Sequence, residues 1–441
     1  MVRSMAGVFS RVMQRWMPDA FVFAIILTLI VFISGITFEQ KGFNQMIDFW
    51  GAGVWKLLAF SMQMVFILVT GHVLANTLLI KRFLARIATV ANTPTKAIII
   101  TSLVASLASW FNWGFGLVVG ALIAKEIARR NANVSFPLLV AVAYSGFIVW
   151  HAGLSGSIPL KIASPQDDAL GSLLNNVPIP VSETIFSTPV LLIVALLFIS
   201  MPILFILMAP KSSVDKEHQS PVEDESTVSI PEVNLTPAQK IEKSPILTLL
   251  LAAIALLYVV NHFIHGGSLG LNVINLILLS LGLILQGSPG NYLKALDESI
   301  TTVGGIVLQF PLYAGIMGMM TSSGLAVSIS AWFVSISTAT TFPLYTFLSA
   351  GLVNFFVPSG GGQWALQAPI VIPAAESLGV PLNQAAMAVA FGDAWTNLIQ
   401  PFWALPLLGI AGLKIKDIMG YCTVALLWSG IVIGVGLMFF Y

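Results

Sequence analysis

The chain has 441 residues, of which 57% are hydrophobic and only 9% are charged. Soluble domains carry about 25% charged residues, so this composition excludes an ordinary water-soluble protein. The net charge of +1 gives no sign of nucleic-acid binding, and the single cysteine, Cys422, excludes an intramolecular disulfide. Apolar runs of about 20 residues, long enough to cross a hydrocarbon core, recur along the whole chain. The composition therefore predicts an all-α polytopic membrane protein.

The first apolar run, Phe21 to Ile36, follows Arg3, Arg11 and Arg15. A basic start followed by an apolar run is also typical of a secretory signal peptide. No convincing small-residue cleavage site follows this run, however, and many more spans come after it. We interpret it as a retained first membrane helix.

The first half of the chain, residues 1–210, is predicted to form one transmembrane repeat. It contains two spans, an amphipathic connector, a hairpin, an interrupted span and a closing span. Their predicted ranges in chain order are 17–36, 49–76, 78–92, 94–130, 136–164 and 187–209.

Residues 211–243 form the one long polar stretch, rich in charge, serine and proline and poor in aromatic residues. This composition favours a disordered cytoplasmic linker. The alternative is a small helix lying on the membrane, but no amphipathic period is visible.

The second half, residues 244–441, is predicted to contain an unpaired span at 245–261 and then a second repeat. The elements of this repeat are predicted at 269–286, 299–320, 325–340, 343–378, 382–413 and 416–440. The sequence QMVFILVTG from residue 63 is echoed by QFPLYAG from residue 309, and AVAYSG from 141 returns as AVAFGD from 388. Several matches in one order, at spacings near 246 residues, indicate an internal duplication.

The predicted crossings set the relative orientation of the two repeats. Four crossings in the first repeat and the extra span make five, an odd number, so the second repeat should enter the membrane from the opposite side. The second repeat should therefore be inverted, and the chain should cross the membrane about nine times. Cytoplasmic loops accumulate Lys and Arg. With the N-terminus in the cytoplasm and the C-terminus outside, 17 of the 20 basic residues fall on the cytoplasmic side.

The two hairpins are predicted to be re-entrant rather than pairs of spans. Residues 94–130 begin and end near basic residues, and the turn Asn112-Trp-Gly-Phe-Gly116 lies between them. Their counterpart, 343–378, turns at Pro358-Ser-Gly-Gly-Gly-Gln363. Non-helical backbone at membrane depth is tolerated only where protein or a watery cavity surrounds it. We therefore expect both turns to lie near a site.

Asp393 is the most informative single residue, because no basic residue lies within twenty positions of it. A carboxylate at the bilayer centre costs about 2.5 to 3.5 kcal/mol on insertion scales, so its presence indicates function. Asp393 could bind a cation such as Na⁺ or carry a proton. The alternative is an acid at a helix end that reaches the interface.

Polar residues and a helix breaker follow Asp393, and a similar interruption occurs in the first half. Thr396 and Asn397 precede Pro401, whereas the first half has His151, Ser155, Ser157 and Pro159. Interrupted helices expose carbonyls that coordinate cations and amides that hold carboxylates. The alternative for either break alone is a proline kink. His151 is a candidate proton carrier, since histidine titrates near neutrality, or a hydrogen-bonded buried residue.

Absent motifs narrow the class of protein. The sequence has no phosphate-binding loop, no zinc-protease motif, no nucleophile elbow and no cysteine cluster. ATP-driven pumping and enzymatic activity are therefore unsupported, and no cofactor is expected. The predicted core also lacks Arg, which favours a small monoanion over a bulky dianion.

Three motifs carry a resemblance to a known family. The runs NWGFGLVVG from Asn112, VPSGGGQW from Val357 and QPFWALP from Gln400 closely resemble the AtoE-type short-chain fatty acid transporter family of bacteria. The likeness extends from Trp16 to Cys422 and is unclear only in the linker. It implies uptake of short-chain carboxylates such as acetoacetate or butyrate across the inner membrane. It also suggests kinship with the ion transporter superfamily, whose members often move substrate by an elevator motion.

By analogy with that superfamily, hairpin turns and helix breaks should form the site, and this sequence supplies the choice of residues. Expected substrate-binding residues are Asn112, Gly114, Gly116, Ser155, Ser157, Ser359, Gly360, Gly361, Gly362, Gln363 and Asn397. Expected ion-coupling residues are Asp393, Thr396, Asn397 and His151, with Na⁺ at Asp393 or a proton in its place. Membrane lipid is an expected partner, and a homodimer is one option.

Three alternative functions stay open at this stage. The chain could transport another small organic anion. A passive channel would need a continuous polar stripe, whereas the polar groups here cluster at two matched interruptions. A membrane-embedded enzyme would need to use His72 or His151 with Asp393, and these residues belong to no recognised catalytic spacing.

Overall fold

The computed structural model describes residues 2–16, 18–56, 58–131, 133–163, 177–210, 236–267, 271–300 and 303–441. Within these ranges every regular element is a helix. Most of the predicted linker, residues 211–235, lies outside the described residues, and its last part contains α12 (Pro237–Glu242). The prediction of an all-α protein is confirmed.

Among the described residues, five helical segments are long and apolar enough to cross a membrane, or up to eight if each bent helix pair forms one span. The five are α6 (Pro94–Phe111), the broken segment Phe136–Ala163, α11 (Thr188–Met208), α13 (Pro245–Ile264) and α22 (Ile415–Phe439). The protein is therefore a multi-pass membrane protein. The count of about nine crossings stays a prediction.

Helix boundaries follow from local sequence signals. The Thr93 hydroxyl accepts a hydrogen bond from the Lys96 amide at the start of α6, and Pro94 occupies its first turn. Ser244 and Pro245 begin α13 in the same way. Capping oxygens satisfy amides that have no partner within the helix, and proline has no amide to satisfy. Gly379, at φ 70°, ends one of the later helices (α19, Gly360–Leu378) in the left-handed conformation that glycine adopts without strain.

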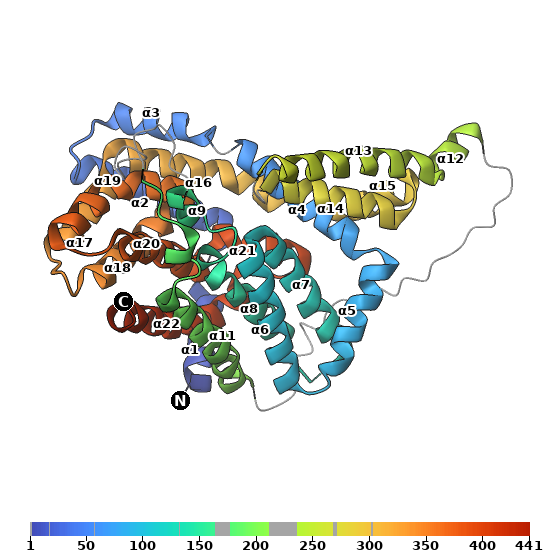
Figure 1. Ribbon diagram of the computed structural model, residues 1–441, viewed down its shortest axis with the longest axis horizontal. Coiled ribbons are helices and arrows are strands. Elements are labelled where there is room, and N and C mark those ends of the chain that lie inside the picture. Colours follow the sequence, from blue (N-terminus) through green and yellow to red (C-terminus); the bar gives the residue numbers. More distant parts are fainter. Residues whose placement is uncertain are drawn as a thin grey trace.

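Four helices at the start of each half are related by position, and two of each set pack on a helix of the other half. In the first half these are α2 (Ala20–Thr37), α3 (Phe43–Val54), α4 (Leu58–Ala75) and α5 (Leu78–Val90). In the second half they are α14 (Leu271–Gln286), α15 (Pro289–Ile300), α16 (Gly304–Ser323) and α17 (Leu325–Ser335). Helices α2 and α3 pack on α16, whereas α14 and α15 pack on α4. Figure 1 shows α13, α14 and α15 beside α4 at one end of the molecule.

Two of these helices differ from the predicted ranges. The predicted span 49–76 is divided between α3 and α4, and α15 precedes most of the predicted span 299–320. The division follows from packing: an added Cβ at Gly53 would lie 2.7 Å from the Ala314 carbonyl oxygen, so α3 approaches α16 at backbone distance. Polar residues such as Asp48 and Asp297 make both helices amphipathic, and hydropathy alone misses such helices.

The remaining elements of each half form a hairpin, a broken helix and a closing helix. The hairpins are α6 with α7 (Trp113–Arg130), and α18 (Phe342–Phe356) with α19. The broken helices are α8 (Phe136–Ser145), η1 (Gly146–Ala152) and α9 (Ser157–Ala163), and then α20 (Leu382–Thr396), η4 (Asn397–Ile399) and α21 (Pro401–Ala411). The closing helices are α11 and α22. Helical hairpins and interruptions thus occur where the sequence predicted them, whereas the re-entrant character and the sidedness of the hairpins stay predictions.

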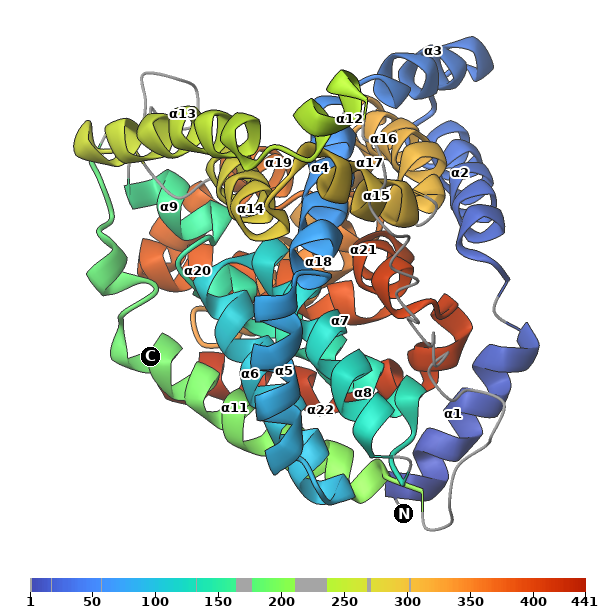
Figure 2. The same ribbon diagram turned by 90° about the vertical axis from the view of Figure 1, so that its right-hand side faces the viewer.

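The two closing helices pack against each other, and α1 (Val2–Trp16) lies on both. An added Cβ at Gly420 would lie 2.4 Å from the Ser10 Cα atom, so the small residues let α1 and α22 approach closely. Figure 2 shows α13 running across one side of the molecule and α1 and α11 on the opposite side. Hairpins and broken helices lie between them.

Candidate functional site

The first hairpin turns at Asn112, whose buried side chain caps the helix that follows. Its Oδ1 atom accepts hydrogen bonds from the amides of Gly114 at 2.9 Å and Phe115 at 3.1 Å. These amides lie at the start of α7, where intrahelical partners are lacking. The turn is therefore rigid, because one side chain satisfies two backbone donors.

The first helix break is bound directly to this turn. The Leu154 amide donates to the Trp110 carbonyl at 2.8 Å, and the Trp113 amide donates to the Ser155 hydroxyl at 3.0 Å. An added Cβ at Gly153 would lie 2.1 Å from the Trp110 oxygen. Only glycine allows this approach, so the break and the hairpin turn form one unit.

The second hairpin turns at Pro358 and Ser359, and its tip lies against the first break. The Ser359 hydroxyl caps α19. An added Cβ at Gly360 would lie 2.6 Å from Cε1 of His151 and 3.1 Å from the Trp150 ring. The tip of the second hairpin thus contacts the first broken helix directly.

A cavity of about 150 Å³ lies where these segments meet. Its walls are three indole rings, a serine and the tip of the second hairpin. The lining residues are Trp113, Trp150, Ser157, Pro358, Ser359, Gly360, Gly361 and Trp403.

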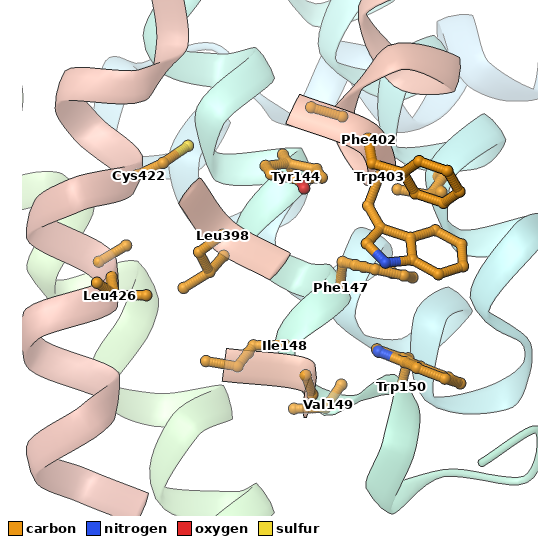
Figure 3. Close-up of a cluster of buried hydrophobic side chains, with 14 of the residues drawn as sticks. Tyr144, Phe147, Ile148, Val149, Trp150, Leu398, Phe402, Trp403, Cys422 and Leu426 are labelled. Atoms are coloured by element: carbon orange, nitrogen blue, oxygen red, sulfur yellow. The ribbon is translucent and has the colours of Figure 1, made fainter. Parts of the chain in front are cut away.

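The three indoles of the cavity wall contact one another. The Trp113 and Trp403 ring centroids lie 5.2 Å apart in an edge-to-face arrangement, and Trp150 lies 6.3 Å from each. Figure 3 shows Trp150 and Trp403 together with Phe147, on the opposite side of the breaks from Cys422 and Leu426 of α22. Phe147 stacks on Trp150 with centroids 5.7 Å apart. One side of the site is therefore a packed aromatic wall.

His151 and Asp393 form a buried pair that joins the two halves of the chain. Their Nδ1 and Oδ1 atoms lie 3.2 Å apart, and their side chains are 0% and 1% exposed. The Ile158 amide donates to His151 Nε2 at 3.1 Å. Because Nε2 accepts this hydrogen bond, it carries no proton, so Nδ1–H donates to Asp393. The imidazole in this arrangement is neutral and supplies no positive charge to the carboxylate.

Three oxygen atoms at the second break lie close to the side-chain nitrogen of Asn354 in α18. The Asn354 Nδ2 atom lies 2.7 Å from the Asp393 carbonyl oxygen, 3.0 Å from the Thr396 hydroxyl and 2.7 Å from Asn397 Oδ1. An amide nitrogen carries two hydrogens, so it cannot donate fully to all three oxygens at once. Asn354 Nδ2 is therefore surrounded by more hydrogen-bond acceptors than its two hydrogens can serve.

Tyr144, at the end of α8, reaches across to the second break. Its hydroxyl donates to the Asn397 carbonyl and lies 3.4 Å from the Gln400 carbonyl. Both carbonyls belong to the interruption between α20 and α21, where the Asn397 carbonyl also accepts a hydrogen bond from the Gln400 amide at 3.2 Å. The first broken helix therefore satisfies backbone acceptors of the second.

Several buried polar atoms around the pair have no hydrogen-bond partner among the described residues. They are Asp393 Oδ2, Asn354 Oδ1, Gln400 Oε1, Asn397 Nδ2 and Trp150 Nε1. Buried polar groups are satisfied in the great majority of cases, so a cluster of exceptions indicates a place for a ligand or ion. Oxygen atoms predominate in this cluster, as hard cations prefer.

The structure divides the sequence-predicted residues into four groups. Ser157, Ser359, Gly360 and Gly361 line the cavity, and Gly362 donates to Ser359 at 3.4 Å. His151, Asp393, Thr396 and Asn397 surround the buried acid. Asn112, Gly114 and Ser155 build the first turn. Gly116 instead lets α6 and α7 approach at Ser109, and Gln363 bonds within the second hairpin to the Ala350 carbonyl and Gln367.

Sequence reasoning missed five side chains that shape this site. Trp113, Trp150 and Trp403 form its wall, and Asn354 and Tyr144 organise the second break. The three tryptophans adjoin the motifs that predicted the turns and breaks, so their position was a usable signal. Asn354 is a polar residue in an otherwise apolar run, and Tyr144 lies in the repeated AVAYSG motif, which did not indicate its role at the second break.

A family model and two full-length relatives indicate the same family for this chain. The family model described as short chain fatty acid transporter matches residues 1–440. A protein of Escherichia coli K12, named as a candidate short-chain fatty acid transporter, is 41% identical over 445 residues, covering 100% of both chains. A protein of Haemophilus influenzae Rd with the same name is 39% identical over 448 residues, again covering 100% of both. The solved YdaH transporter of Alcanivorax borkumensis is 15% identical with a TM-score of 0.46, covering 96% of this chain and 99% of that one.

Proposed function

Because this chain belongs to the short-chain fatty acid transporter family, we propose that it takes up small monocarboxylates such as butyrate and acetoacetate across the bacterial inner membrane, driven by Na⁺ or H⁺. The observation that carries the proposal is the cavity of about 150 Å³ between the hairpin tip and the two breaks. One imidazole ring links this cavity to a buried carboxylate.

The size of the cavity supports a small substrate. A cavity of about 150 Å³ in another protein binds benzene, which has as many non-hydrogen atoms as butyrate. Pockets for drug-sized ligands are larger, at about 300 to 1,000 Å³. The volume therefore favours an acid with a short acyl chain.

The chemistry of the walls supports a monocarboxylate. The first amides of α19, at Gly360 and Gly361, have no intrahelical partner and lie at the positive end of a long helix, which favours an anion. The Ser157 hydroxyl adds a further donor, while the indoles offer apolar faces to an acyl chain. None of the described residues that line the cavity is Lys or Arg. A second carboxylate would therefore lose hydration without gaining a partner.

The buried acid supports ion coupling. Asp393 receives a hydrogen bond from a neutral imidazole, and its Oδ2 atom has no partner among the described residues. An ionised carboxylate in such surroundings is strongly unfavourable without a cation, and a proton removes the charge altogether. Na⁺ would be held by Asp393 together with the oxygens of Thr396 and Asn397, which already converge near Asn354.

His151 provides a short physical path between the two sites. Its ring stacks on Trp150 of the cavity wall with centroids 4.1 Å apart, and Gly360 lies against its edge. A cation or proton at Asp393 that shifts this ring would also shift the cavity wall. Binding of the two solutes would then be linked, as symport requires.

Transport can be tested with purified protein in sealed proteoliposomes. Labelled butyrate and acetoacetate should accumulate above equilibrium when a Na⁺ or a pH gradient is imposed separately, and uptake should saturate. Unlabelled butyrate should inhibit more strongly than succinate. Non-saturable equilibration without counterflow would indicate a channel, and stronger inhibition by succinate would contradict the wall chemistry.

The membrane arrangement is part of the proposal. We place the N-terminus in the cytoplasm, the C-terminus in the periplasm, and the two hairpin turns on opposite sides, as inverted repeats with an elevator motion require. Cysteines introduced near Asn112 should be labelled from the cytoplasmic side and those at Pro358 to Gln363 from the outside, in at least one transport state. Cys422 would first be replaced. Labelling of both turns from one side in every state would overturn the inversion.

A further inference from the structure

We infer that Gly361 sets the upper limit on the acyl chain length that this transporter accepts. The inference rests on the proposed function, because it assumes that the cavity holds the substrate. Gly361 lies in the first turn of α19 and lines the cavity. Gly361 differs from its two neighbouring glycines in the amount of free space that surrounds the position of an added Cβ atom.

An added Cβ at Gly361 meets no atom within 4 Å, whereas at Gly360 it would collide with the His151 ring. At Gly362 it would lie 3.0 Å from the Ser359 hydroxyl. The φ angle of Gly361 is not positive, so alanine fits its backbone conformation. Of the three tip glycines, Gly361 alone therefore combines a place in the cavity lining with open space for an added side chain.

The aromatic wall of the cavity cannot withdraw to make room for a larger side chain. Trp150 and Trp403 are 2% and 4% exposed, and both rings contact Phe147 and Trp113. Packed interiors resist displacement, so an added group reduces the free volume instead of moving the wall. A methyl group at position 361 would take the space of about one methylene of the substrate.

The effect should depend on chain length, because a short acid leaves this space empty. One methylene in an apolar pocket changes specificity by about 10- to 200-fold. We expect Gly361→Ala to raise the KM for butyrate by about tenfold or more and that for acetate by a much smaller factor. Gly361→Val should extend the loss to propionate.

The test measures uptake of labelled acetate, propionate, butyrate and pentanoate in proteoliposomes of each variant. Gly51→Ala is the matched control, because Gly51 lies within α3, away from the cavity, and also has nothing within 4 Å of an added Cβ. Its chain-length profile should equal that of the wild type. Trp113→Phe, which enlarges the cavity, should move the limit in the opposite direction and improve pentanoate uptake.

The outcomes separate this inference from the proposed function. If wild-type protein takes up none of the four acids, the proposed function fails. If the wild type transports them but Gly361→Ala and Gly361→Val lower all four equally, or Trp113→Phe leaves the limit unchanged, the proposed function stands and the role of Gly361 is wrong. A shift toward shorter acids in the first two variants and toward longer acids in the third supports the inference.

Discussion

The two helix breaks occupy equivalent places in the two halves, yet they differ in length and chemistry. The first is long: η1 spans Gly146–Ala152, four more residues follow before α9, and its side chains include Phe147 and Trp150. The second is short, with η4 at Asn397–Ile399 followed by Gln400. Aromatic rings dominate the first, whereas amide and hydroxyl oxygens and an acid dominate the second.

This difference suggests that the two breaks have separate tasks. The first break supplies Trp150 to the cavity wall and a neutral imidazole, while the residues at the second break and the end of α20 supply the acid and the oxygens that the proposed cation would contact. The two regions are in direct contact, since His151 of the first break meets Asp393, which lies in α20 just before the second break. A variant in the second break should therefore alter ion dependence first, and a variant in the first should alter substrate recognition first.

The largest effect is expected from Asp393→Asn, which keeps the shape of the side chain and removes its charge. Gradient-driven accumulation of butyrate should fall to equilibrium while the protein still inserts and folds. Under H⁺ coupling, substrate exchange should persist, because the amide resembles the protonated acid. Under Na⁺ coupling, Na⁺-stimulated exchange should fall as well. Accumulation and ion dependence equal to wild type would show that Asp393 is structural.

His151→Ala is the next most severe change, because His151 joins the two breaks. It leaves the Ile158 amide and Asp393 Oδ1 without their partner, at about 1 to 3 kcal/mol for each buried group. Thermal unfolding in detergent should show this loss, and both butyrate affinity and ion dependence should change. His151→Gln, which keeps a donor and an acceptor, should recover part of the stability. Unchanged ion dependence in a folded His151→Ala protein would contradict the link between the sites.

A smaller effect is expected from Asn354→Ala, which removes the amide at the centre of the oxygen cluster. The loss of stability should be about 2 kcal/mol, and stabilisation by Na⁺ in thermal unfolding should decrease if Na⁺ is the coupling ion. Asn275→Ala is the control, since Asn275 is buried in α14 and donates to the Gln63 carbonyl away from the site. An equal change in ion response for both variants would show that Asn354 acts only through packing.

Tyr144→Phe should have the smallest effect, because Tyr144 positions the backbone of the second break and does not itself bind the coupling ion. It removes the hydroxyl that donates to the Asn397 carbonyl, at about 1 kcal/mol, which corresponds to a change of about fivefold in the apparent affinity for the coupling ion. Tyr313→Phe is a matched control, because the buried Tyr313 hydroxyl has no partner among the described residues. Equal ion affinities in wild type and Tyr144→Phe would remove Tyr144 from this account.

The sequence predicted the parts of the site that depend on local signals. Asn112 and Ser359 lie at the two turns because both follow apolar helices and precede glycine-rich starts, and these signals are visible within a few residues. Asp393 was informative because an isolated acid in an apolar run is costly. The breaks at Pro159 and Pro401 were likewise predictable from a missing amide and nearby polar residues.

What the sequence did not predict depends on contacts between distant residues or on amphipathic helices. His151 and Asp393 are 242 residues apart, so neither local sequence names the other as a partner. Trp113 and Trp403 belong to different halves and meet only after the breaks pack on the hairpin. Helices α3 and α15 carry polar residues among apolar ones, so a search for apolar runs merges or omits them.

The most direct test of coupled transport measures butyrate and ion movement together in the same proteoliposomes of wild-type protein. Labelled butyrate, labelled Na⁺ and internal pH would be followed at once, with protein-free vesicles used to subtract diffusion of neutral butyric acid. The account predicts that protein-dependent butyrate entry is accompanied by Na⁺ or H⁺ entry at a fixed ratio, and that this ratio is lost in Asp393→Asn. Protein-dependent butyrate entry that moves neither ion, or an unchanged ratio in Asp393→Asn, would contradict it.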